Sequence, residues 1–142
     1  MQEHLKIQED QKKSLDHLKN NFKSRFTKLV KKTCDIVEEI NELLKGEPTD
    51  CPIIKNIIKE KSDILYAFKI ILHHFEKNLE NNNFEKMEEA IGLAEYEIGI
   101  LKTSAKKWEE QINIKRVAHL KELIAKYRRF LLYPKNDELL VA

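Results

Sequence analysis

Apolar residues recur every three or four positions along most of the chain, a spacing that places side chains on one face of an α-helix. The first such run extends from Leu15 to Leu44 and predicts one long helix that ends at Gly46 and Pro48. Gly accommodates the left-handed conformation that closes a helix, and Pro disfavours helix in the residue before it. Residues 1–14 contain few apolar side chains, so we expect a frayed N-terminus.

Two further runs predict a second and a third long helix. The second run reaches Leu79, and Asp50 and Pro52 predict its start, because Asp caps helices and Pro in the first turn lacks only an N–H that would be unpaired anyway. Three asparagines then precede Phe84, from which a third run continues to Ile112 without a missed position. A run of about four heptads is typical of helices that pack side by side at shallow angles.

Beyond residue 112 the apolar pattern restarts out of phase. Ile114 follows Ile112 by two positions, and residues two apart point to nearly opposite sides of a helix. The new stripe continues to Leu131. Two structures fit it: a fourth short helix that folds back, or a helical overhang that continues the third helix. Residues 133–142 are expected to form a loose tail.

Together these patterns predict an all-α fold. We expect an elongated antiparallel bundle of three long helices, with a fourth short helix or a helical overhang at the C-terminus, because short loops make successive helices antiparallel neighbours. A length of 142 residues suits one domain, so residues 1–142 are predicted to be a single helical-bundle domain. Three Gly and three Pro are too few for the many turns of an all-β fold.

The charge distribution narrows the choice of partner. The net charge is only +2, so we do not expect a nucleic acid as the main partner. The basic residues nevertheless cluster in residues 12–32 and 115–135. Arg116, Arg128 and Arg129 are therefore weak candidates for binding a nucleic acid or another anionic surface.

Cysteine content and hydropathy bear on the compartment. Cys34 and Cys51 form neither a C-x-x-C pair nor a disulfide framework, which fits a reducing compartment. No apolar run approaches the length of about 18 residues that a membrane span needs. We expect no membrane span and a cytoplasmic protein.

Two acidic motifs lie on successive predicted helices. Glu38-Glu39-x-x-Glu42 and Glu60-x-x-Asp63 resemble the EExxE…ExxD signature of the all-α nucleoside triphosphate pyrophosphohydrolases, the MazG-like and dimeric dUTPase group. The resemblance implies a Mg²⁺-dependent enzyme in which Glu39, Glu42, Glu60 and Asp63 hold the metal against a nucleotide's phosphates. On a helical wheel, however, Glu42 faces away from the apolar stripe, so a shared metal site would require a second layer such as a partner subunit.

A second resemblance points to a protein without enzymatic activity. Residues 41–72 are similar to the helix, short break and "EKxxLL" helix of flagellar export chaperones of the FlgN type. That resemblance implies a helical protein that holds the helix of an export partner in a groove. No phosphate-binding Gly-rich loop, G-x-S-x-G motif or catalytic Cys context appears, so we assign no catalytic residue and lean toward a protein that is not an enzyme.

The last apolar stripe favours a function in protein binding, because a three-helix core does not need it. We expect a non-enzymatic interaction module, an adaptor or a chaperone-like protein, that needs no cofactor. Its partner would be another protein or a second copy, with a homodimer as one form. The predicted contact residues are Val117, Leu120, Ile124, Tyr127 and Leu131.

Overall fold

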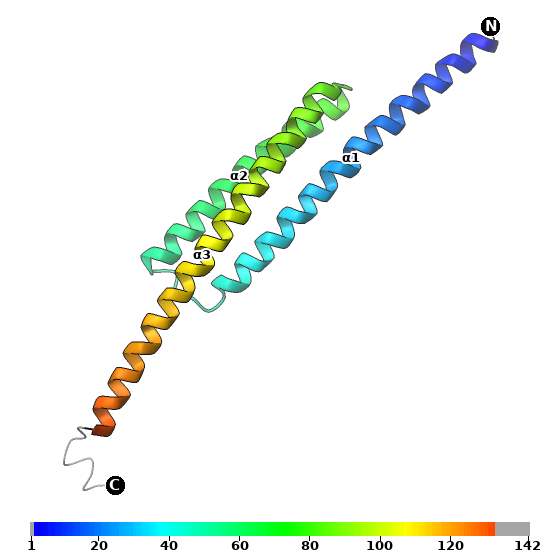
Figure 1. Ribbon diagram of the computed structural model, residues 1–142. Coiled ribbons are helices and arrows are strands. Elements are labelled where there is room, and N and C mark those ends of the chain that lie inside the picture. Colours follow the sequence, from blue (N-terminus) through cyan, green and yellow to red (C-terminus); the bar gives the residue numbers. More distant parts are fainter. Residues whose placement is uncertain (1, 133–142) are drawn as a thin grey trace.

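The computed structural model describes the backbone of residues 2–132 and the side chains of residues 5–131. Its three helices are α1, Gln2–Leu44, α2, Pro52–Glu80, and α3, Phe84–Leu132 (Figure 1). The all-α prediction is confirmed, and residues 2–132 contain no strand. The tail predicted at 133–142 lies outside the described residues.

The helix ends follow local capping chemistry, with one exception. Gly46 has a φ of +80°, the left-handed conformation predicted after α1. Asn83 caps α3, since its Oδ1 accepts a hydrogen bond from the backbone N–H of Lys86 at 3.2 Å. The prediction that Asp50 caps α2 is wrong: Cys51 occupies that position without a side-chain hydrogen bond, and Pro52 begins the helix.

Contacts far apart in sequence define how the helices run. Phe22 stacks on Phe84, and the carbonyl of Leu43 accepts a hydrogen bond from Arg116. Residue numbers therefore rise together along α1 and α3, so these two helices run in the same direction. Figure 1 shows α2 beside α3, with α1 on the other side of α3.

One hydrophobic core joins the three helices, and α3 contributes the largest share of its buried residues because it packs against both other helices. The third apolar stripe is buried as predicted, with Phe84 and Ala105 only partly covered. On α1 the core is narrower than predicted, since Leu18 is exposed and Thr33 is buried with its hydroxyl donating to the Leu29 carbonyl at 2.9 Å. The fully buried large side chains are Ile40, Ile54, Ile57, Met87, Ile91, Leu101, Trp108 and Ile112.

Both ends of the molecule extend beyond this core. α1 begins at Gln2, although we predicted a frayed segment over residues 1–14. The residues there are mostly good helix formers such as Glu, Gln and Lys, which need no apolar stripe to be helical. We call residues 2–18 the α1 overhang; Figure 1 shows this end of α1 extending past the turn between α2 and α3.

At the other end, α3 runs on past Asn113 as one helix to Leu132. No fourth short helix is present in residues 2–132, and the second alternative, a helical overhang, is what the structure shows. Residues 100–132 contain no Gly or Pro that would end the helix. We call residues 114–132 the α3 overhang.

Two glycines inside α3 offer a simple stability test. A Cβ added at Gly92 or Gly99 would meet no atom within 4 Å, so neither glycine allows a neighbouring helix to approach closely. Gly92→Ala and Gly99→Ala should each raise the free energy of unfolding by about 0.5–1 kcal/mol, because Ala has the higher helix propensity. Urea denaturation followed by circular dichroism measures this change. Gly46→Ala is the control and should destabilise, since it forces a side chain into the left-handed conformation; equal effects of all three substitutions would contradict the prediction.

Candidate protein-interaction surface

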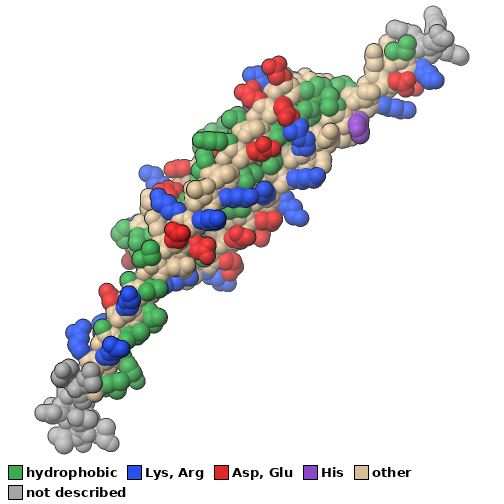
Figure 2. Space-filling view, in the orientation of Figure 1, with side chains coloured by type: hydrophobic (Ala, Val, Ile, Leu, Met, Phe, Trp, Pro, Cys, Tyr) green, Lys and Arg blue, Asp and Glu red, His purple; other side chains and the backbone are tan. Residues whose placement is uncertain are grey.

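The α3 overhang exposes a continuous series of large apolar side chains. Eight of them are between 46% and 70% exposed. Figure 2 shows hydrophobic atoms on this narrow end of the molecule, interspersed with basic side chains. The eight are Ile114, Val117, Leu120, Leu123, Ile124, Tyr127, Phe130 and Leu131.

All five predicted contact residues belong to this series, and the structure places them at the surface of one helix. The predicted contact set left out Ile114, Leu123 and Phe130. Leu123 and Phe130 stand three residues after Leu120 and Tyr127, so the 3-and-4 spacing could have found these two. With them, three positions in each heptad are apolar, which is typical of a helix that faces a bundle and wider than the two-position stripe of a simple coiled coil.

Basic side chains flank this apolar face. The segment 114–132 contains Lys115, Arg116, Lys121, Lys126, Arg128 and Arg129 against the single acid Glu122. Arg128 and Arg129, two of the predicted anion-binding residues, are exposed on the overhang. Arg116, the third, is already engaged in contacts with the end of α1.

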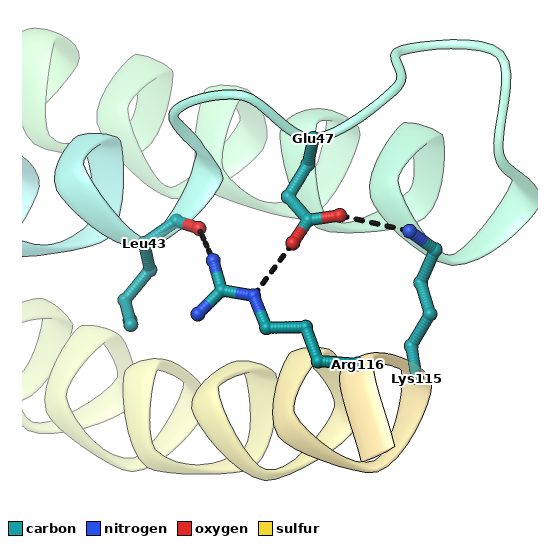
Figure 3. Close-up of polar contacts among 4 residues, drawn as sticks. All are labelled: Leu43, Glu47, Lys115 and Arg116. Carbon is teal, nitrogen blue, oxygen red and sulfur yellow. Dashed lines mark hydrogen bonds and ion pairs between the residues drawn. The ribbon is translucent and has the colours of Figure 1, made fainter. Parts of the chain in front are cut away.

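Glu47 ties the loop after α1 to the base of the overhang (Figure 3). Its carboxylate accepts hydrogen bonds from Lys115 Nζ at 2.8 Å and from Arg116 Nε at 2.7 Å, and it is only 9% exposed. Arg116 also donates to the carbonyl of Leu43 at 2.9 Å, which satisfies a carbonyl in the last turn of α1. The hydrogen bonds from Lys115 and then from Arg116 hold the pKa of Glu47 below its usual value.

Glu47→Gln should therefore weaken the fold in a pH-dependent manner. Because folding lowers the pKa of Glu47, its contribution is present above the unfolded pKa of about 4.3 and is lost as pH falls through the lower folded value. We expect a loss of about 1 kcal/mol at pH 7, since both basic partners are partly exposed. Thermal unfolding at several pH values measures the gap between wild type and variant, which should close in acid. Glu122→Gln, an exposed acid on the overhang, is the control; a gap that persists unchanged at low pH would contradict this role of Glu47.

The four acids of the predicted metal site lie on two helices, α1 and α2. The Glu60 carboxylate accepts a hydrogen bond from the Trp108 indole at 2.7 Å, so it faces α3, and Asp63 is exposed elsewhere on α2. Glu39 and Glu42 are exposed on α1. Within residues 2–132 no group of three or more Asp, Glu, His or Cys side chains is placed to hold a metal ion.

Glu39 and Glu42 instead line an open groove of about 900 Å³ between α1 and α3. Glu109 and Arg116 close its α3 side. Five of its eight lining residues are Asp or Glu, and their carboxylates are spread along α1 and α3. Its lining residues on α1 are Asp35, Glu38, Glu39, Asn41, Glu42 and Leu43.

No known protein family, curated protein or solved structure matches this chain. Of the helices that the structure describes, none combines the length and the apolar composition that crossing a membrane requires. The two resemblances stated from short motifs thus stay predictions, and the function has to be argued from the surface itself.

Proposed function

We propose that this chain is a protein-binding module, without enzymatic activity, whose binding element is the α3 overhang. The observation that carries the proposal is the exposure of eight large apolar side chains on one helix outside the core. Such a patch is what an amphipathic helix presents when it docks against another protein. At about 100 Å² each, these side chains offer on the order of 800 Å², the area per partner of a standard specific interface.

The rest of the molecule supports this role as a scaffold. We infer an antiparallel arrangement in which α2 runs opposite to α1 and α3, since Phe26 stacks on Phe75 while Asn41 accepts a hydrogen bond from Lys61. The bundle anchors α3, and Glu47 fixes the base of the overhang. The overhang is therefore presented as a preformed helix, which reduces the ordering cost of binding. We place this activity in the cytoplasm, where the free thiols of Cys34 and Cys51 would stay reduced.

A pair of double variants tests the proposal. Leu120→Glu with Ile124→Glu puts two charges on the apolar face, whereas Ala118→Glu with Ala125→Glu puts the same charges on the reverse face of the same helix. All four positions are exposed, so circular dichroism should show both variants folded. The tagged full-length chain is used to retain proteins, which are quantified by mass spectrometry. We expect a set of proteins whose retained amount falls at least tenfold with the first variant and is unchanged with the second. Identical sets for wild type and the first variant would overturn the proposal.

The pyrophosphohydrolase alternative makes a different demand on the chain. It requires Glu39, Glu42, Glu60 and Asp63 to act together, and here Glu60 accepts a hydrogen bond from Trp108. Incubation with a panel of nucleoside triphosphates and Mg²⁺ separates the two functions. If pyrophosphate is released and Glu42→Gln abolishes the release, the protein is an enzyme and the proposed binding function is wrong.

A further inference from the structure

The α1 overhang exposes apolar side chains that continue the core face of its helix. Ile7, Leu15 and Leu18 are apolar, and with the polar Gln11 between them they follow one another at steps of three or four that lead to Phe22. Phe22 stacks on Phe84, which is the first residue of α3. The positions of α1 before Phe22 therefore lie beyond the start of α3 and have no α3 residue beside them. Ile7 is 55% and Leu18 40% exposed. A shallow groove of about 450 Å³ runs along this stripe, and Asp10 and Ser14 complete its lining.

At the opposite end of the molecule, the α3 overhang likewise has a side with no neighbouring helix. Arg116 marks the side of α3 that faces α1, because it contacts Leu43 and Glu47. From Arg116, steps of three or four lead to Leu120, Leu123, Tyr127 and Phe130. These side chains therefore lie along the line that α1 would occupy if it did not end at Leu44.

We propose that the occupant of the α3 overhang is the α1 overhang of a second copy of this chain. This inference rests on the proposed function and names its partner. The α1 overhang, residues 2–18, is about 25 Å long and the α3 overhang, residues 114–132, about 28 Å long at about 1.5 Å per residue, so the two segments are similar in length. α1 and α3 run in the same direction within one chain, and a shift of the second copy along the long axis keeps that direction. The new contact thus repeats the α1–α3 packing already present inside each copy.

Charge favours this pairing over a symmetric one. The α3 overhang has six basic residues against one acid, so two α3 overhangs side by side would repel each other. The α1 overhang is close to neutral, with Glu3, Glu9, Asp10 and Asp16 against Lys6, Lys12 and Lys13. Its acids can approach the basic flanks of the α3 face at little cost.

The resulting interface is heterologous: one end of a copy binds the opposite end of the next. In a dimer formed by such a contact, each copy keeps one free binding end. Further copies can therefore add, which generates chains or rings of subunits. The protein should therefore form a concentration-dependent series of assemblies larger than a dimer.

A mixing experiment tests this assembly with the full-length protein. The α1 variant is Ile7→Glu with Leu15→Glu, and the α3 variant is Leu120→Glu with Ile124→Glu. Light scattering after size exclusion should show wild type growing in mass with concentration and each variant alone as a monomer. An equimolar mixture of the two variants should give a dimer and nothing larger, because one intact α3 overhang meets one intact α1 overhang. Ala118→Glu with Ala125→Glu is the control and should assemble like wild type.

The other outcomes overturn the inference and remain distinguishable from failure of the proposed function. If the α1 variant alone forms dimers that the α3 variant does not, the overhangs of α3 pair symmetrically. If wild type is monomeric at every concentration but its retained protein set still depends on Leu120 and Ile124, the occupant is a different protein. A monomer that instead binds vesicles of anionic phospholipid assigns the face to a membrane surface. A monomer with none of these activities removes both proposals.

Discussion

Phe26→Ala is expected to lower the free energy of unfolding by about 3–5 kcal/mol, the largest effect among single substitutions in the first helix. Phe26 is buried and stacks on Phe75 with ring centroids 4.2 Å apart, while Phe68 lies at 6.1 Å. Truncation leaves a cavity at the place where α1 meets α2. Because these two helices make few other close contacts, little can collapse to fill it. Urea denaturation followed by circular dichroism gives the change directly.

Phe130→Ala is the matched control for this substitution. It removes the same side chain from the α3 overhang, where Phe130 is 55% exposed. For the isolated chain we expect a change below about 0.5 kcal/mol. Similar costs for the two substitutions would mean that α1 does not pack on α2 through Phe26.

Trp108→Ala should cost about as much, roughly 3–5 kcal/mol, for a different reason. Trp108 is fully buried, and its indole N–H donates to Glu60 at 2.7 Å, which joins α3 to α2. The variant loses both the packing of the ring and a hydrogen bond to a charged acceptor. The midpoint and slope of urea denaturation measure the loss.

Trp108→Phe separates the two contributions, because it keeps an aromatic ring and removes only the donor and part of the volume. We expect it to cost about half as much as Trp108→Ala. Glu60 keeps a second hydrogen bond, from Asn56 at 3.2 Å, so its carboxylate is not left without a partner. If Trp108→Phe is as harmful as Trp108→Ala, the hydrogen bond and not the packing dominates at this position.

The sequence predicted the helices well where apolar spacing alone decides them. Every third or fourth residue from Phe84 to Ile112 is apolar, and that stripe is the core of α3. The helical course of residues 2–14 was not predicted, because Leu5 and Ile7 alone do not establish an apolar stripe there. The N-cap of α2 was misplaced by one residue. Cys51, which makes no side-chain cap hydrogen bond, occupies the position that was predicted for Asp50.

The candidate surface was predicted in part for the same reason. The predicted contact set contained five of its eight apolar residues, and the same spacing would have added Leu123 and Phe130. Whether that stripe folds back or projects depends on the absence of a break near Asn113. The role of Glu47 was not predictable, because its partner Lys115 stands in another helix. The acidic motif stays a prediction as a metal site. Spacing along two helices does not determine which way Glu60 turns, and in the structure its carboxylate turns toward Trp108.

The uninterrupted course of α3 has a mechanical consequence. Its 49 residues make a helix about 74 Å long at about 1.5 Å per residue, and the bundle holds it along residues 84–113. A partner bound to the α3 overhang cannot tilt without rotating the whole bundle, so α3 acts as a lever arm. Docking of a partner at one end of the molecule would thereby fix the orientation of its opposite end.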